Sequence, residues 1–362
     1  MIEDICTNEK YSFTGGPFGS NLKVSDYTQS GVRVIQLNNI NDIYFNDDNK
    51  VFVSVKKADS LKSCNAYSGD LIFAKMMPAG RLCILPKTYD RYLLGSDAIR
   101  LKPNIDKYYC FFLLECLNRT IIRNSITSKT SGSTRQRIGL LDLKKTSFYC
   151  PNYIEQKQIG LFFELIESKI SNISKKINIL KKYKEGFTKR LAKTLNTDEI
   201  ALSSICSITT GKMDANAMNP QGKYKFFTCS REDYFIDTYA FDCEALLVSG
   251  NGEVGLTKYY NGKFNAYQRT YVLYNLKRNA KFIKLFIDLQ INTIIRKETN
   301  KGAMPYIRLT TFNKIMIPNI DQSLEYLISI VIDKIDKKIE LLQNHARVLN
   351  NIKNNLLGSL FI

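Results

Sequence analysis

One spacing in this sequence matches a known chemical motif. Gly250-x-Gly252-x-x-Gly255 has the glycine pattern that holds the pyrophosphate of a dinucleotide. That chemistry needs a helix starting at the glycines and an acidic residue about 20 positions later. Here residues 256–260, Leu-Thr-Lys-Tyr-Tyr, have the composition of a strand, and position 275 is Asn. We therefore interpret the glycines as a connection between strands.

Other catalytic patterns are missing from the sequence. There is no Pro-Pro step of the kind that amino-methyltransferases place beside the flipped base, and no Gly-x-x-x-x-Gly-Lys-Ser/Thr loop. His345 is the only histidine, and the nine cysteines are scattered without a Cys-x-x-Cys pair, so we predict no metal site. We interpret the cysteines as reduced thiols of a cytoplasmic protein. Because these catalytic motifs are missing, we predict that the chain is not an enzyme.

The charge of the chain points to a polyanionic partner. It carries 52 basic and 34 acidic side chains, a net charge of +18 in 362 residues. No apolar run approaches the ~20 residues of a membrane span, so nucleic acid is the expected partner. Arg, Lys, Asn and Gln donate hydrogen bonds to base edges. The candidates for DNA contact are Lys23, Arg33, Gln36, Asn38, Arg81, Arg135, Arg137, Lys212, Asn251, Lys258, Gln268 and Arg269. For each, the alternative is a solvated surface charge or an internal ion pair.

Two stretches of the sequence resemble each other. Ile173-Ser-Lys-Lys-Ile177 corresponds to Ile335-Asp-Lys-Lys-Ile339, and each stretch lies in a long segment with a helical pattern. Each segment follows a Pro-Asn step, at 151–152 and at 318–319. We predict a tandem duplication of one unit, a globular part followed by a helix.

Apolar side chains recur every seven residues in both helical segments, with a second set at the alternate spacing. This periodicity of about 3.5 residues predicts a coiled-coil seam. Lys184 interrupts it in the first segment. The predicted seam residues are Ile159, Phe163, Ile166, Ile170, Ile173, Ile177, Leu180, Ile328, Ile332, Ile335, Ile339, Leu342 and Leu349.

Each seam needs a facing helix. The simplest arrangement packs the two segments antiparallel within one molecule, and the alternative is an intermolecular dimer through each helix. A seam from Ile159 to Leu191 is roughly 50 Å long at ~1.5 Å per residue. One turn of DNA is about 34–36 Å, so a seam of this length would hold two DNA contacts more than one turn apart.

We predict an α+β fold in which two long antiparallel coiled-coil helices separate two globular domains, with a pseudo-twofold internal repeat. The expected boundaries are 1–150 and 198–319 for the domains and 151–197 and 320–362 for the helical spacers.

Several stretches resemble the specificity subunits of type I restriction–modification systems. Residues 14–23, Thr-Gly-Gly-Pro-Phe-Gly-Ser-Asn-Leu-Lys, are similar to the opening of a target-recognition domain, and 69–74, Gly-Asp-Leu-Ile-Phe-Ala, to its central strand pair. Residues 131–138 resemble the exit towards the conserved helix, and 262–273 resemble a stretch recurrent in the same family. The resemblance covers essentially the whole chain, but the second exit departs from the first at Asp321-Gln-Ser323.

The resemblance implies two target-recognition domains that read a bipartite, asymmetric sequence in double-stranded DNA. It also implies that the helices dock two methyltransferase subunits, and that motor-nuclease restriction subunits join the full complex. No cofactor is expected on this chain, because S-adenosylmethionine and ATP would bind the partner subunits. Three alternatives stay open at this point. They are a solitary or silent specificity-like protein without active partners, a basic coiled-coil protein that binds DNA without sequence preference, and a nicotinamide enzyme.

Overall fold

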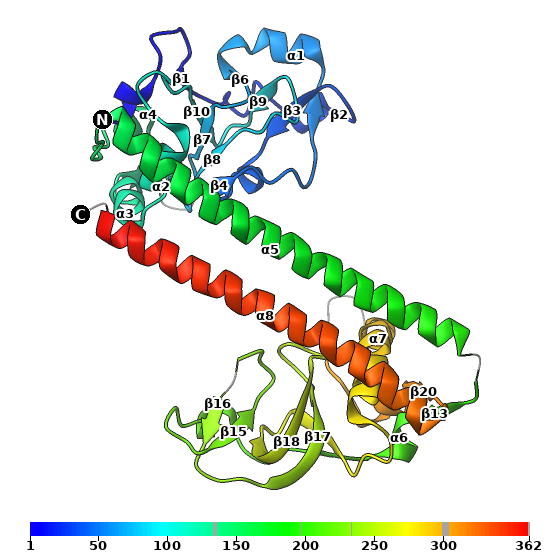
Figure 1. Cartoon of the computed structure of the whole chain (residues 1–362). Coiled ribbons are helices and arrows are strands. Elements are labelled where there is room, and N and C mark those ends of the chain that lie inside the picture. Colours follow the sequence, from blue (N-terminus) through cyan, green and yellow to red (C-terminus); the bar gives the residue numbers. More distant parts are fainter. Residues whose placement is uncertain (133–135, 196, 233, 299–303, 361–362) are drawn as a thin grey trace. The chain divides into compact units, whose positions relative to one another are not determined.

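Two long helices run through the molecule, and each is shared between two compact units. The computed structural model describes all residues except 133–135, 196, 233, 299–303 and 361–362. The helices are α5, Tyr153–Thr194, and α8, Gln322–Leu360 (Figure 1). One unit contains Met1–Asn172 with Ala346–Ile362, and the other contains Ile173–His345. Each unit therefore holds one globular domain and a part of each helix.

The first domain is built on two five-stranded sheets. One has the order β1-β10-β7-β8-β4, with the bounds Phe13–Gly15, Ala98–Leu101, Leu71–Ala74, Leu82–Ile84 and Ile43–Tyr44. The other has the order β2-β5-β3-β9-β6, with the bounds Tyr27–Thr28, Phe52–Val53, Val32–Ile35, Tyr92–Leu94 and Asn65–Ala66. Alternate residues of a strand face opposite sides of its sheet. In β7, Leu71 and Phe73 join a core with α2, whereas Ile72 and Ala74 join a core with the second sheet. This explains why the strand reads as a continuous apolar run.

Short helices and one small hairpin complete the first domain. They are α1 (Val55–Ser60), α2 (Cys110–Leu117), α3 (Thr120–Thr127), α4 (Leu140–Lys144), β11 (Thr130–Ser131) and β12 (Arg137–Ile138). In the described part of this domain, 3-10 turns lie at Ile2–Ile5, Val24–Asp26, Leu37–Asn39 and Lys62–Cys64.

The second domain is built on one six-stranded sheet with the order β14-β19-β17-β18-β15-β16. The bounds are Ser207–Thr210, Thr270–Tyr274, Phe241–Ser249, Thr257–Ala266, Tyr224–Phe227 and Tyr234–Ile236. Leu246 and Val248 of β17 pack with α7, Ala280–Glu298, whereas Ala245 and Leu247 join aromatic side chains on the opposite face. The remaining elements are α6 (Leu202–Ile205), the pair β13 (Glu199–Ala201) and β20 (Met316–Pro318), and 3-10 turns at Ala215–Ala217 and Leu309–Lys314.

Both long helices begin directly after a side-chain cap. The Oδ1 atom of Asn152 accepts a hydrogen bond from the backbone N–H of Glu155 at 3.0 Å. In the second repeat, Oδ2 of Asp321 accepts from the backbone N–H of Ser323 at 2.8 Å. Such caps satisfy backbone donors that the first helical turn leaves without partners. The departure from the family pattern at 321–323 therefore still starts a helix.

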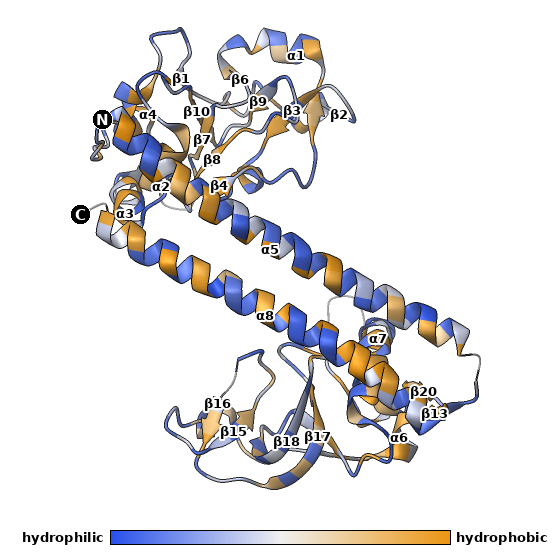
Figure 2. Cartoon of the chain, in the orientation of Figure 1, coloured by the Kyte–Doolittle hydropathy of each residue, from blue (hydrophilic) through white to orange (hydrophobic). Residues whose placement is uncertain are grey.

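The two helices are antiparallel within each unit. In the first unit, Ile159 and Phe163 of α5 share a core with Leu356 of α8. In the second, Leu191 of α5 shares a core with Ile328 of α8. The thirteen predicted seam residues are all buried or half-buried. Figure 2 shows hydrophobic bands recurring along both helices.

Two lysines occupy seam positions. Lys184, the predicted interruption, donates from Nζ to both carboxylate oxygens of Asp336 in α8 at 2.7 Å. Lys353 lies seven residues after Ala346, at a seam position that the heptad analysis did not single out. Its Nζ lies 2.8 Å from Glu115 of α2 and also pairs with Glu167 of α5. Both polar interruptions therefore join helices that are distant in sequence.

Candidate nucleic-acid interface

The predicted contacts near the start of the first domain lie on surface turns. Lys23 and Asn38 are exposed, and Gln36 is half-buried where its backbone N–H donates to Oδ1 of Asn39 at 2.8 Å. Each belongs to or flanks a 3-10 turn. Arg135 lies outside the described residues.

Arg33 occupies a different environment from the one that a DNA contact requires. All four residues of β3 are buried, and Arg33 has no exposed surface. Its Nε donates to Oδ1 of Asp47 at 3.0 Å, and its guanidinium lies over the rings of Phe45 and Phe52. Of the two alternatives to DNA contact, Arg33 fits the internal ion pair, and its buried guanidinium is not presented to DNA.

Arg137 lies at the exit from the first domain, and Arg81 lies directly before β8. Nε of Arg137 in β12 donates to Oδ1 of Asp97 at 2.7 Å, and this hydrogen bond raises the pKa of the guanidinium. The ion pair fixes Arg137 while leaving it partly exposed. Arg81 is half-buried, and its Nε has no hydrogen-bond partner among the described residues.

Three predicted residues of the second domain come together at one cavity. Asn251 follows β17, whereas Gln268 and Arg269 form the turn between β18 and β19. The turn containing Asn251 is held beside them because the backbone N–H of Gly250 donates to the carbonyl of Arg269 at 2.9 Å. We call this cavity the domain 2 corner. It is lined by Thr210, Gly250, Asn251, Gln268, Arg269, Tyr271, Tyr306 and Ile307.

The corner contains three polar side chains that the sequence reasoning missed, Thr210, Tyr271 and Tyr306. Tyr306 is reached through the backbone: the N–H of Ile307 donates to the carbonyl of Gly250 at 3.0 Å. The hydroxyl of Tyr271 donates to the carbonyl of Ile307 at 3.0 Å. In sequence, residues 302–307 resemble the exit of the first repeat at 131–138, and this resemblance is the signal that could have found Tyr306.

The other two candidates of the second domain lie outside this cavity lining. Lys212 is exposed just after β14. Nζ of Lys258 in β18 donates to the backbone carbonyls of Arg231 and Glu232 at 3.0 and 3.1 Å. Lys258 thus ties the connection before β16 to β18.

The glycine pattern at 250–255 forms a connection between two antiparallel strands, as predicted. Gly252 and Gly255 have positive φ angles of 59° and 81°, which glycine adopts at low cost. The backbone N–H of Gly255 donates to the carbonyl of Ser249 at 2.9 Å, and β18 follows directly. A helix does not begin at these glycines, so the dipole that holds a pyrophosphate is not present there.

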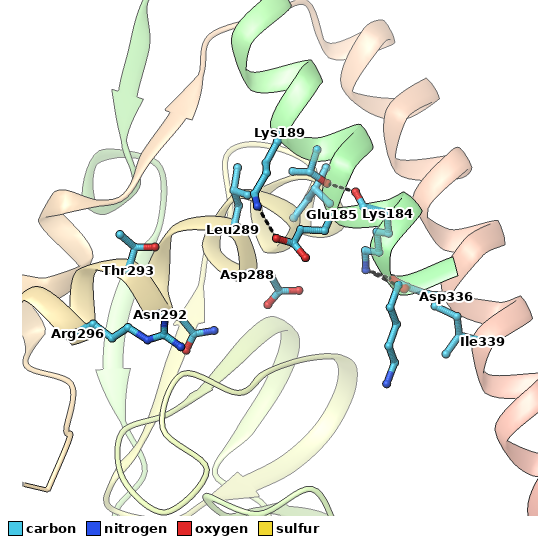
Figure 3. A pocket seen from close by; sticks show the side chains of 13 residues that line it. Lys184, Glu185, Lys189, Asp288, Leu289, Asn292, Thr293, Arg296, Asp336 and Ile339 are labelled. Atoms are coloured by element: carbon cyan, nitrogen blue, oxygen red, sulfur yellow. Dashed lines mark hydrogen bonds and ion pairs between the residues drawn. The ribbon is translucent and has the colours of Figure 1, made fainter. Parts of the chain in front are cut away.

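A second cavity, of about 650 Å³, lies between α5, α7 and α8 in the second unit (Figure 3). Its charged lining side chains are largely paired with one another: Lys184 with Asp336, and Lys189 with Glu185. Asp288 pairs with Lys284 of its own helix. These pairs explain the place of Lys184 in the seam.

Neither the cysteines nor the carboxylates form a reactive cluster in the described part of the chain. Burial raises the pKa of the Cys83 and Cys116 thiols to about 12, which suppresses the reactive thiolate. Among described residues, no group of three His, Cys, Asp or Glu side chains could hold a metal ion. No described helix is both long and apolar enough to cross a membrane.

Comparisons with known proteins agree on one family. The model of the type I restriction modification DNA specificity domain matches this chain twice, over residues 4–182 and 196–351. The EcoDI specificity subunit of Escherichia coli is 36% identical over 142 residues, which are 39% of this chain but only 31% of that subunit. A putative type I specificity subunit of Mycoplasma pneumoniae is 23% identical over 65% of this chain and 68% of its own length.

A solved structure shares the fold over the whole chain. It is the S subunit of a type I restriction-modification system from M. genitalium, with a TM-score of 0.67 and 16% identity. The match covers 98% of this chain and 96% of that one. It confirms the predicted α+β fold, and the two family matches confirm the duplication.

Proposed function

Because the chain belongs to the family of type I restriction–modification DNA specificity proteins, we propose that its two domains each read one half of an interrupted DNA target. The supporting observation is that the model of the DNA specificity domain matches the chain twice, over residues 4–182 and 196–351, so that each half has its own copy. An excess of about a dozen positive charges lies outside the helical spacers, where phosphates would be contacted. The chain would be a non-catalytic cytoplasmic subunit, with S-adenosylmethionine and ATP bound by its partners.

The proposal predicts a specific kind of target. We expect the complex of this chain with its methyltransferase subunits to select two short, unlike sequences separated by a gap of constant length. The measurement is binding selection from a randomised duplex library, with sequencing of the bound DNA. A single uninterrupted target would contradict the proposal.

The same experiment separates this function from non-specific binding. A specific reader binds its target at least ~10³-fold tighter than other DNA at the same salt concentration. Equal competition by unrelated duplex would favour the basic coiled-coil alternative. A titration with NAD tests the nicotinamide alternative independently.

The helices offer two equivalent surfaces for a partner. Phe162 and Leu165 of α5 correspond, 162 positions later, to Leu324 and Leu327 of α8. All four apolar side chains are between 40% and 59% exposed. A patch that occurs once in each repeat fits a partner that binds in two copies, and we propose a methyltransferase subunit as that partner.

Charges placed in these patches should remove one partner copy each. We expect Phe162→Glu with Leu165→Glu to weaken one methyltransferase site by at least about tenfold, and Leu324→Glu with Leu327→Glu to weaken the other. Native mass spectrometry of the complex would then show one partner copy instead of two. Leu141→Glu is the control, because this exposed leucine of α4 lies on neither long helix. Unchanged stoichiometry in both double variants would contradict the assignment.

A further inference from the structure

The domain 2 corner presents hydrogen-bond donors that the described structure leaves without partners. The side chains of Asn251, Gln268 and Arg269 make no hydrogen bond or ion pair with any described residue. Two arginines of the same unit form ion pairs, Arg231 with Glu253 and Arg278 with Glu325, whereas Arg296, like Arg269, forms none with a described residue. The guanidinium of Arg269 therefore makes no contact in the described structure that would explain an arginine at this position.

The backbone around the corner is fixed even though these side chains are not engaged. The N–H of Gln268 donates to the carbonyl of Met213 at 2.9 Å, and that of Thr270 to the carbonyl of Tyr267 at 2.8 Å. Gly211 lies so close to this turn that an added Cβ would fall 1.9 Å from the carbonyl oxygen of Ala266. The turn is a rigid support that holds two adjacent donor side chains at the surface.

The first domain contains the same backbone arrangement. The N–H of Lys75 donates to the carbonyl of Asp97 at 2.8 Å, as that of Gly250 does to Arg269. The N–H of Ile138 donates to the carbonyl of Lys75 at 2.9 Å, as that of Ile307 does to Gly250. These bonds place corresponding residues in pairs: Met76 with Asn251, Asp97 with Arg269, and Arg137 with Tyr306.

The chemistry at the corresponding positions is different. Where the second domain has the unpaired cation Arg269, the first has the carboxylate of Asp97, which is occupied by Arg137. Where the second has the amide of Asn251, the first has the thioether of Met76. One backbone support thus carries two unlike sets of side chains.

We infer that the domain 2 corner reads a purine in the half-site of the second domain, with Arg269 as the main specificity-determining residue. This inference rests on the proposed function and assigns the residues that perform it. Arg donates two hydrogen bonds to O6 and N7 of guanine, and Asn or Gln donates to N7 and accepts from N6 of adenine. Both patterns require the N7 atom that only purines present. The corner of the first domain has no counterpart of Arg269, so the two half-sites differ at this position.

Binding selection on the complex with methyltransferase subunits tests the inference. We expect Arg269→Ala to reduce the preference for guanine at one position of one half-site by about 5- to 150-fold, the range for one bidentate pair. Preferences at the other half-site should be unchanged. Arg269→Lys keeps the positive charge but loses the paired donors. Compared with Arg269→Ala, it should therefore restore the affinity for DNA more than the preference for guanine. Arg296→Ala is the matched control, because it removes one exposed arginine from α7 of the same unit.

The outcomes distinguish this inference from the proposed function. Uniform weakening on all sequences by Arg269→Ala would mean a phosphate contact and would overturn the inference. An unchanged preference would overturn it as well, while the interrupted target of the unaltered complex would still support the proposed function. If the unaltered complex selects no two-part target, the proposed function itself fails.

Discussion

Replacing Lys353 by Met is expected to lower the free energy of unfolding by about 3–5 kcal/mol, the usual cost of removing one partner from a buried ion pair. The Lys353 side chain is 9% exposed and lies between the carboxylates of Glu115 and Glu167. Burial raises the pKa of Glu115 even with this lysine beside it. Without the ammonium group, two carboxylates would share a site that is largely closed to water.

The pH dependence of this loss identifies its cause. A buried carboxyl with a raised pKa binds a proton more readily in the folded protein than in the unfolded chain, so its stability contribution falls as pH rises. The defect of Lys353→Met should therefore shrink as the pH is lowered from 7 towards 5. Chemical denaturation at both pH values, on the variant and the unaltered protein, measures the effect.

Two further variants serve as controls for Lys353. Lys189→Met removes the exposed partner of Glu185 on α5, and we expect no measurable change in stability because solvent-exposed ion pairs contribute little. Combining Lys353→Met with Glu115→Leu and Glu167→Leu should recover most of the lost stability, because no buried charge then lacks a partner. A loss below about 1 kcal/mol for Lys353→Met would show that the lysine is not the counter-charge of these acids.

Adding one heptad to both long helices is expected to lengthen the gap in the DNA target without changing the bases read. The insertion points lie between Asn172 and Ile173 in α5 and between His345 and Ala346 in α8, where the division into units crosses the helices. Seven residues add about 10 Å of helix, and each base pair adds about 3.4 Å of duplex. The gap should grow by up to about three base pairs, which is the increase expected if the helices run parallel to the DNA axis.

The seam explains why both helices must be extended together. An inserted heptad repeats the seam period, so the contacts on either side keep their register. Insertion into α5 alone shifts the seam residues of α5 by a whole heptad relative to those of α8. This variant should lose the preference for a single gap length between the half-sites. Binding selection reads both outcomes. A target gap that is unchanged by the double insertion would show that the helices do not measure the distance between half-sites.

Features that depend on local spacing could be predicted from the sequence. The heptads of α5 and α8 arise because residues three and four apart share one face of a helix, and the caps at Asn152 and Asp321 act within one turn. The glycines at 250–255 were assigned to a strand connection from the residues that follow them. The repeat of Ile173–Ile177 at Ile335–Ile339 was sufficient to predict the duplication.

Features that depend on partners distant in sequence were beyond such reasoning. Arg33 has the residue type of a surface donor, but Asp47 and two aromatic rings surround it in the core. In the sequence, Lys353 only interrupts a heptad pattern, whereas in the folded chain it forms ion pairs with Glu115 and Glu167. The corner that holds Arg269 is completed by Tyr306, 37 positions away. Periodicity reports which face of an element is apolar, whereas the state of a charged side chain depends on what the folded chain places within a few ångströms of it.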